Sequence, residues 1–206
     1  MLRLSQPISW IQKGSGFVVE FTLVSAPPLA GYSERFGTVT LSAPKDLAVV
    51  NMAIPLGADA KALKAVKSGY GVDMPDPGTS VETKKGAARL VRLAPDQAFV
   101  VFTLPTPDAE EVVAKHVKTA LYLTDQTDVW AGLEISGAGS IAALERVCPI
   151  DLHPAGFAVG DAARTVMEHL GVLIIRTGED RYLLLSASSS AGSFLHMLET
   201  SIKNVL

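Results

Sequence analysis

Two stretches of the chain share the same order of strand-like, turn-forming and helix-like positions. Residues 47–66 (LAVVNMAIPLGADAKALKAV) align with residues 128–147 (DVWAGLEISGAGSIAALERV) at an offset of 81, obtained as 128 − 47. In each copy apolar residues alternate as in a half-buried strand, a glycine follows, and the spacing then becomes helical. The expected strand face of the second copy carries Val129, Ala131, Leu133 and Ile135. The pattern therefore predicts an internal repeat.

Each copy continues into an expected β-hairpin. The first covers residues 88–102 and turns at Pro95-Asp96, and the second covers residues 172–185 and turns at Gly178-Glu179. These residue types favour tight turns. The turns are 83 residues apart, obtained as 178 − 95, so only small insertions separate the copies. We therefore expect an α+β fold made of two strand-helix-hairpin-helix halves about a pseudo-twofold axis.

An amphipathic helix is expected after each hairpin. For the first helix, Thr106 is the expected N-cap, Pro107 the first helical residue and Asp108 a favourable charge at the positive end of the dipole. Its apolar stripe carries Ala109, Val112, Val113, His116, Val117 and Ala120. The second helix should begin near Ser193, and its inner face carries Phe194, Leu195, Leu198, Ile202 and Val205. Burial of each valine contributes about 1.5–3 kcal/mol, enough to dock such a helix on a sheet.

Two segments stand apart from the repeat. Residues 17–24 read as a strand, but Pro27-Pro28 interrupts the chain directly after it, and the segment before Leu47 shows no partner in the other copy. The polar stretch 75–86 (PDPGTSVETKKG) is expected to be an exposed loop.

These boundaries predict how the chain is organised. Residues 1–46 are expected to form an N-terminal extension packed on the domain or on a partner. Residues 47–206 are expected to form a single pseudo-symmetric α+β domain, with halves at about 47–121 and 128–206.

Composition narrows the function classes. Among 206 residues there is one cysteine and a net charge of −3, with basic residues scattered among acids. No basic patch indicates a nucleic-acid partner, no apolar run approaches a membrane span, and the N-terminus lacks an apolar secretory region. A lone cysteine suits a reducing compartment, so a cytoplasmic location is expected. The mean hydropathy of +0.30 fits either a large core or an extensive subunit interface.

The glycine-rich turn at residues 137–142 is a candidate nucleotide site. Gly137, Gly139 and Ala142 match the G-x-G-x-x-A pattern between an expected strand and an expected helix. The helix ends by Cys148-Pro149, however, and no buried strand follows at the distance the dinucleotide fold needs. The sequence therefore favours a compact strand-to-helix turn, with a dinucleotide-binding oxidoreductase as the weakest alternative. A sheet without parallel βαβ units would remove that alternative.

Other candidate groups are better explained by structure than by chemistry. None of the four histidines shows metal-ligand spacing: we expect His116 to be a satisfied core or interface residue and His153 to hold a turn, and we assign no metal to His169 or His196. Capping is the simpler role for the carboxylate pairs Asp125/Asp128 and Asp73/Asp76. Cys148 is expected to be a buried thiol, and Gly14-Ser15-Gly16 is no nucleophile elbow. We assign no catalytic, cofactor-binding or metal-binding residue to the chain.

Several motifs resemble the gamma subunits of heterotetrameric sarcosine oxidases. The strongest run from Val147 onward: Cys148-Pro149-x-Asp151-Leu152, Phe157-x-x-Gly160, Arg164-Thr165 and Arg176-Thr177-Gly178-Glu179-x-x-Tyr182. Residues 93–97 (LAPDQ) resemble the family's hairpin turn, and residues 125–128 leading into 133–137 resemble its central strand and turn. The likeness covers roughly Leu47 to Glu199 and is weak in the first 45 or so residues.

This resemblance implies a fold and a role. The fold should be similar to that of folate-binding aminomethyltransferases, with duplicated, ferredoxin-like α+β halves. In such complexes sarcosine is oxidatively demethylated to glycine, and the one-carbon unit passes to tetrahydrofolate or leaves as formaldehyde. FAD, FMN, NAD and tetrahydrofolate are expected in partner subunits, namely alpha and beta, with a small zinc-bearing delta as a further candidate partner. The gamma subunit would then be a non-catalytic part of an oxidoreductase, with a stand-alone folate-binding or one-carbon transfer module as the alternative.

Overall fold

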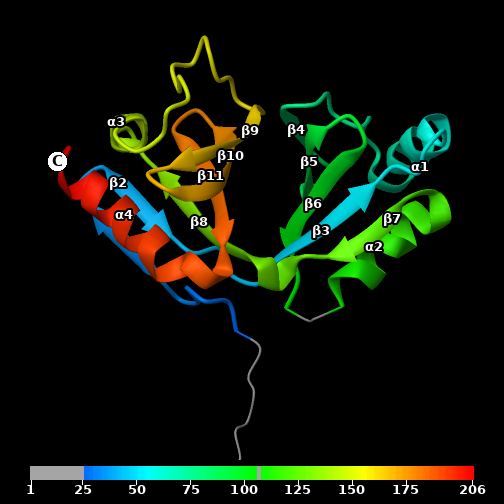
Figure 1. Cartoon of the computed structure of the whole chain (residues 1–206), viewed down its shortest axis with the longest axis horizontal. Helices are drawn as coiled ribbons and strands as arrows, with labels where there is room; N and C mark the ends of the chain where they lie inside the picture. The colour runs from blue at the N-terminus through cyan, green and yellow to red at the C-terminus, as the bar shows by residue number, and fades with distance from the viewer. Residues whose placement is uncertain (1–25, 106–107) are drawn as a thin grey trace, which may run out of the picture.

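The computed structural model describes residues 26–105 and 108–206. Its strands form two sheets in which every pairing is antiparallel (Figure 1). The first sheet has the order β4-β5-β6-β3-β7, with bounds β3 Leu47–Ala53, β4 Thr79–Glu82, β5 Ala88–Ala94, β6 Gln97–Thr103 and β7 Tyr122–Asp125. The second sheet has the order β1-β2-β8-β11-β10-β9, with bounds β1 Ser33–Phe36, β2 Val39–Ser42, β8 Trp130–Ser136, β9 Ala162–Met167, β10 Leu170–Gly178 and β11 Arg181–Ala187.

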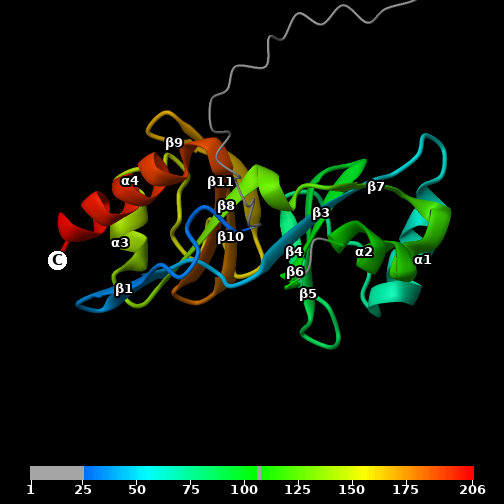
Figure 2. The same cartoon turned by 90° about the horizontal axis from the view of Figure 1, so that it is seen from below.

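Helices cover one face of each sheet. Helices α1 (Asp59–Tyr70) and α2 (Ala109–Val117) share an apolar core with the first sheet. Helices α3 (Ser140–Glu145) and α4 (Ala191–Lys203) do the same for the second sheet. Three short 3-10 turns, at Lys118–Ala120, Thr127–Val129 and Ser188–Ser190, complete the described elements. The two helix pairs lie at opposite ends of the molecule (Figure 2), and a third apolar cluster joins the other faces of the two sheets.

The repeat expected from the sequence is confirmed in this arrangement. Strand β3, helix α1, hairpin β5–β6 and helix α2 correspond in order to β8, α3, hairpin β10–β11 and α4. Both hairpins even carry a bulge at the same place, between Arg92 and Ala94 and between Arg176 and Gly178. The second turn lies at Glu179-Asp180, one residue beyond the expected position. The duplicated α+β fold with ferredoxin-like halves is therefore correct.

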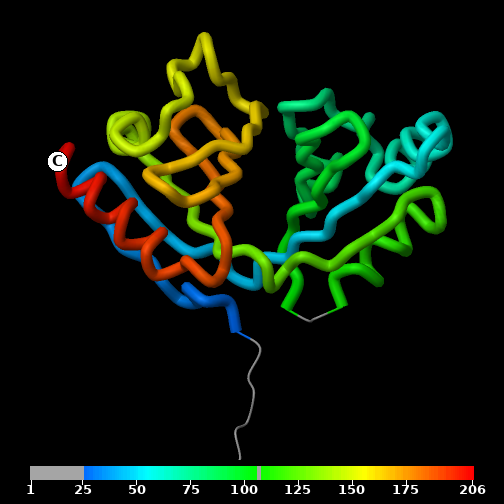
Figure 3. Tube along the Cα trace, viewed as in Figure 1, coloured from blue at the N-terminus to red at the C-terminus, as the bar shows by residue number. Residues whose placement is uncertain are grey.

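The segment before Leu47 does have a counterpart in the repeat, so the expectation that it had none is wrong. Strand β2 pairs with β8, with Leu41 opposite Ile135. Strand β7 pairs in the same way with β3, with Met52 opposite Leu123. Strand β2 comes directly before β3 of the first sheet but belongs to the second sheet, and β7 comes directly before β8 of the second sheet but belongs to the first. The connections β2–β3 and β7–β8 therefore both cross between the sheets (Figure 3). The two halves thus exchange one strand each.

Several local expectations need correction. The stretch expected as an exposed loop at residues 75–86 contains β4, and Ser80 and Thr83 in it are buried. The prediction was wrong because these polar side chains form hydrogen bonds, Ser80 with the other half and Thr83 within the turn. Val129 lies outside β8 and is exposed. Helix α4 begins at Ala191, two residues before the expected start.

The expected cap of the first amphipathic helix falls partly outside the described residues. The cap residues outside the described part are Thr106 and Pro107. Also outside it are the strand expected at residues 17–24 and the turn Gly14-Ser15-Gly16. Within the described residues Asp108 occupies the N-cap position of α2, without a side-chain capping bond. The stripe itself is confirmed at Ala109, Val113 and Val117, all buried.

Two arginines at equivalent positions hold the two bulged hairpin turns. The guanidinium of Arg176 donates to the carbonyl oxygens of Phe157 and Glu179, each at 2.6 Å, and to that of Gly178 at 3.4 Å. Arg92 repeats this pattern with the carbonyls of Pro75, Ala94 and Pro95. Arg176 is only 2% exposed, whereas Arg92 is half-buried. Because buried carbonyl groups need hydrogen-bond partners, Arg176 supplies to the buried carbonyl of Phe157 a contact that water cannot.

A hydrogen bond between side chains joins the N-terminal part of the described chain to the last helix. The hydroxyl of Tyr32 donates to Oε1 of Glu199 on α4 at 2.7 Å. This bond is the main reason why the pKa of Glu199 is lowered from its ordinary value of 4.5, with Lys203 adding a smaller effect in the same direction. A lowered carboxyl pKa means that the bond stabilises the folded state above the ordinary pKa and that this stabilisation is lost as the pH falls below it.

Replacing Tyr32 by phenylalanine should therefore have a pH-dependent effect. Near neutral pH we expect the free energy of unfolding to fall by about 1–2 kcal/mol, since the lost bond ends on a charged group. In acid, as the pH falls from the ordinary carboxyl pKa of 4.5 through the lowered pKa of Glu199, most of this difference should vanish. Urea denaturation at both pH values measures it. Tyr122→Phe, at an exposed tyrosine, is the control and should change nothing; a Tyr32→Phe difference that persists in acid would contradict the linkage.

Candidate functional site

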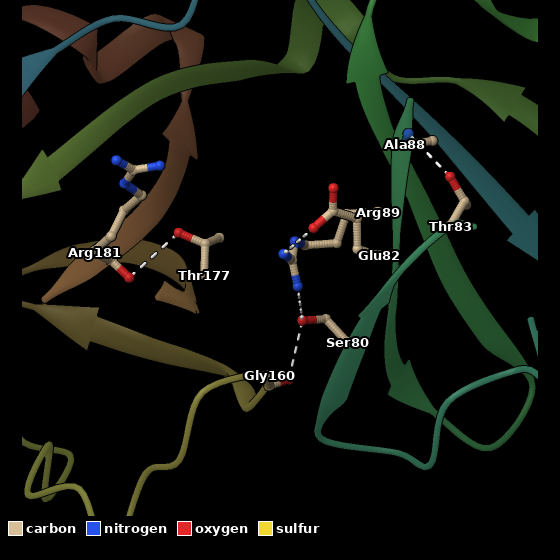
Figure 4. Close-up of polar contacts among 8 residues, drawn as sticks. All are labelled: Ser80, Glu82, Thr83, Ala88, Arg89, Gly160, Thr177 and Arg181. Atoms are coloured by element: carbon tan, nitrogen blue, oxygen red, sulfur yellow. Dashed lines mark hydrogen bonds and ion pairs between the residues drawn. The ribbon is translucent and has the colours of Figure 1, made fainter. Parts of the chain in front are cut away.

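The seam between the two halves carries a small set of polar contacts (Figure 4). Ser80 on β4 donates both its backbone N–H and its hydroxyl to the carbonyl of Gly160, the hydroxyl at 2.9 Å. The N–H of Ala162 donates to the carbonyl of Gly78 at 2.8 Å, which is the symmetry-related contact. Strands β4 and β9 are thereby joined across the pseudo-twofold axis, with Thr79 opposite Asp161. The two sheets are tied edge to edge at this point.

Arg89 brings a positive charge to this seam. Its guanidinium donates to Oγ of Ser80 at 3.2 Å and lies 3.6 Å from the carboxylate of Glu82. Burial lowers the pKa of Arg89, and Glu82 partly offsets this effect. Figure 4 shows Arg89, Ser80 and Gly160 in a single chain of contacts between the halves. The arrangement holds two halves together, and every polar group named here is already engaged within the chain.

The space between the facing sheets is filled by apolar side chains. Phe99, Leu173 and Ile175 belong to the cluster that joins the two sheets, and each is at most 1% exposed. A folate held between the two halves would need room for its pterin ring and polar groups to bind it. Within the described residues, the facing sheets offer neither at this cluster, so the residues present there do not fit a folate.

One pocket lies where the two crossing connections meet. It has a volume of about 480 Å³ and is lined by residues of both connections, among them Pro44, Asp46, Asp125, Asp128 and Trp130. The carboxylate pair singled out in the sequence therefore borders a cavity. However, Oδ1 of Asp125 accepts the N–H of Thr127 at 2.9 Å, which is the capping role expected for it. In the second pair, Asp73 forms an exposed ion pair with Lys67 at 2.9 Å.

The glycine-rich turn at residues 137–142 packs against the N-terminal hairpin. Gly137 has φ of 111°, and a Cβ there would lie 1.9 Å from the carbonyl oxygen of Thr38. A Cβ on Gly139 would lie 2.7 Å from Val39. Both glycines are therefore needed for close contact with the β1–β2 turn. Because every pairing among the described strands is antiparallel, the parallel βαβ unit of a dinucleotide site is missing from them, and that alternative is removed.

All four histidines are exposed. His116 stacks on Tyr70 with ring centroids 4.8 Å apart, and its Nδ1 lies 3.1 Å from the carbonyl oxygen of Gly69. His116 is therefore exposed, and the core role expected for it is wrong. Its ring is satisfied as expected, and the interface role stays a prediction. Nδ1 of His153 accepts the N–H of Ala155 at 3.3 Å, which agrees with the expected turn role.

Cys148 is a buried thiol, as expected. Burial raises its pKa, while weaker hydrogen bonds from Ile150 and Thr165 oppose this effect. A raised pKa keeps the sulfur protonated and a poor nucleophile. Burial therefore outweighs the contacts that would activate this thiol.

Residues 26–105 and 108–206 contain neither a metal-binding cluster nor a membrane-spanning helix. No group of three or more histidine, cysteine, aspartate or glutamate residues there is arranged to hold a metal ion. No helix in this part of the chain is long and apolar enough to cross a membrane.

The fold resembles two solved structures. One chain of a heterotetrameric sarcosine oxidase from Corynebacterium sp. U-96, solved in complex with pyrrole 2-carboxylate, superposes with a TM-score of 0.69 at 22% identity, covering 81% of this chain and 85% of that one. Aminomethyltransferase T of the glycine cleavage system from Bartonella henselae superposes with a TM-score of 0.60 at 15% identity, covering 78% of this chain and 45% of that one. At these identities the likeness shows the fold, which is the aminomethyltransferase-like fold expected from the sequence.

Sequence comparison is more specific. A sarcosine oxidase subunit gamma from Corynebacterium sp. (strain P-1) is 25% identical over 188 residues, which is 89% of this chain and 93% of the relative. A subunit of the same name from Arthrobacter sp. is 29% identical over 133 residues, covering 65% of this chain and 64% of the relative. The family model described as sarcosine oxidase, gamma subunit family, matches residues 56–203. Since that match spans well over half of the chain, the protein belongs to the sarcosine oxidase gamma subunit family.

Proposed function

We propose that the chain is the non-catalytic gamma subunit of a heterotetrameric sarcosine oxidase and acts in assembly with flavin-bearing alpha and beta subunits. The complex would oxidatively demethylate sarcosine to glycine and pass the one-carbon unit to tetrahydrofolate. FAD, FMN, NAD and tetrahydrofolate would bind to the partner subunits, and a delta subunit is a further candidate partner. The lone thiol of Cys148 fits a cytoplasmic setting.

The family match over residues 56–203 carries this proposal. It is supported by a relative of nearly the same length that bears the name subunit gamma, and by a structural neighbour described as heterotetrameric. Those names describe the relatives, and their assembly is extended here to this chain.

Exposed apolar side chains add independent support for an assembly role. Leu56 is fully exposed, and Tyr122, Val159 and Val166 each expose half or more of their area. Single exposed apolar residues are common on any protein. Together with a mean hydropathy of +0.30, they fit a chain that buries part of its surface against other subunits.

An affinity pull-down tests the proposal. The tagged full chain, isolated from its native host grown on sarcosine, should elute with two large subunits and the visible absorbance of flavin. Mass spectrometry would identify the subunits, and oxidation of sarcosine by the eluate would identify the activity. A colourless chain that elutes alone from the same culture would contradict the assembly role.

A stand-alone folate-binding or one-carbon transfer module remains the second candidate, favoured by the likeness in fold to aminomethyltransferase T. The apolar filling between the sheets speaks against a folate there. Titration of the full chain with tetrahydrofolate decides the matter, because absence of saturable binding at millimolar ligand would rule this candidate out.

A further inference from the structure

One apolar pocket opens in the first half, on the side away from the seam. It has a volume of about 380 Å³ and lies between the C-terminal ends of α1 and α2, the β4–β5 turn and β6. Its walls include Tyr70, Val100, Phe102 and Val113, and Lys84 and Lys85 stand on the turn at its rim. Ligand and anchor pockets in proteins begin at about this size.

The two halves line this region of the fold differently. In the second half, Met167 and Phe194 are fully buried in the core beneath α3 and α4. The hydroxyl of Ser201 on α4 donates to the carbonyl of Ala143 on α3 at 2.6 Å, which holds that helix pair together. The second half also has a pocket, of about 420 Å³, which lies at the end of α3 and is lined by residues such as Cys148, Val166 and Glu168. Of these two pockets, only that of the first half has aromatic walls and a pair of lysines.

The pocket is held open by rigid contacts. His116 stacks on Tyr70, and its Nδ1 donates to the carbonyl of Gly69 at 3.1 Å, since a carbonyl oxygen can only accept. A Cβ on Gly69 would lie 2.5 Å from the carbonyl oxygen of His116, so the two helices approach as closely as a glycine allows. A pre-formed pocket costs its occupant little ordering entropy.

The rim is positively charged although the chain carries a net charge of −3. Each of the helix ends that face the pocket contributes about half a negative charge, about one unit in total, which the two lysines exceed. Lys84 and Lys85 form no ion pair within the described residues, because the nearby Glu82 is directed to Arg89. An apolar interior with a basic rim complements an apolar group that stands beside negative charge.

From this complementarity we propose that a partner subunit inserts an apolar or aromatic anchor side chain, flanked by acidic residues, into the pocket between α1, α2 and the β4–β5 turn. The inference rests on the proposed assembly function and assigns one contact within it. Anchors of this kind carry much of the binding energy at subunit interfaces, because they are fully desolvated and surrounded by contacts that exclude water. The acidic flank would meet Lys84 and Lys85 and would set the orientation of the partner.

Two variants test the contact. Ala87→Trp places an indole at an exposed position on the pocket wall, and Lys84→Glu/Lys85→Glu reverses the charge of the rim. Each tagged full chain is co-expressed with the alpha and beta subunits of its host, and the affinity for those partners is measured on the purified proteins. We expect each variant to weaken the affinity at least tenfold. Lys61→Glu/Lys64→Glu, the same charge change at exposed positions of α1, should leave it unchanged.

The outcomes separate this inference from the function on which it rests. If the unaltered chain captures no alpha or beta subunit, the proposed function itself fails. If the unaltered chain captures them and both variants do so equally well, the pocket contact is wrong while the function stands. If the variants instead lose self-association, seen by light scattering, the pocket belongs to a second copy of this chain and the inference is overturned. The charge reversal lies on an exposed turn, so it remains informative even if Ala87→Trp fails to fold.

Discussion

Replacing Arg176 by methionine should lower the free energy of unfolding by about 2–3 kcal/mol. The methionine side chain fills much of the same space, but it leaves the buried carbonyl oxygen of Phe157 without its donor, while the exposed carbonyl of Glu179 can turn to water. Each buried, unpaired acceptor costs about 1–3 kcal/mol. Proteins of this kind are stable by only about 5–15 kcal/mol, so the loss is large. Urea denaturation followed by circular dichroism measures it.

Arg92→Met is the matched control, because Arg92 contacts the equivalent carbonyl groups of the first hairpin. Arg92 and its acceptor Pro75 are half-buried, whereas Phe157 is buried, so water can replace the lost donor at the first hairpin. We expect a loss of about 1 kcal/mol for this variant. Equal losses at the two positions would show that burial does not determine the role of Arg176.

Replacing Gly137 by alanine should be at least as damaging, with an expected loss of about 3–5 kcal/mol. The new methyl group would overlap the carbonyl oxygen of Thr38, and φ at this position is 111°, a region that residues with a side chain rarely adopt. The β1–β2 hairpin would have to move away from the turn. Because β2 supplies a strand to the second sheet, we expect the amide protons of Val39 to Ser42 to lose protection from hydrogen exchange.

Gly192→Ala provides the control for this substitution. Gly192 lies in α4, and a Cβ there would meet nothing within 4 Å. Alanine is the better helix former, so this variant should gain about 0.5–1 kcal/mol. A Gly137→Ala variant as stable as the original chain would mean that the turn is not as tightly packed as its geometry indicates.

The sequence predicted the repeated elements because each is encoded locally. The alternating residues of β8 and the Pro95-Asp96 turn between β5 and β6 carry their own structural preference, and the same order appears twice. The strand exchange could not be predicted in this way. Strand β2 has four residues (VTLS), and its counterpart β7 (YLTD) aligns with it through only one leucine, Leu41 with Leu123. Only tertiary pairing therefore reveals their equivalence.

The two arginine contacts were missed although a signal for them was available. Arg92 and Arg176 stand at the same distance before the two hairpin turns, in VRLAPD and IRTGED. A comparison of the aligned hairpins would have shown a charged residue repeated within apolar strands, which indicates a buried ionic contact. The prediction of a compact strand-to-helix turn at Gly137 and Gly139 is confirmed. A sequence cannot by itself distinguish glycines that receive a phosphate from glycines that receive a neighbouring backbone.

The exchange of strands between the halves also determines when each sheet can be completed during synthesis. Leu41 on β2 pairs with Ile135 on β8, a separation of 94 residues obtained as 135 − 41. Strand β2 can pair with β1 at once, but its other edge must wait for β8 until most of the chain has left the ribosome. Strand β8 itself needs β11, which is made later still. Pairings so distant in sequence are slow to form and expose strand edges in the meantime. A nascent chain of this kind would depend on chaperones or on early contact with its partner subunits until translation ends.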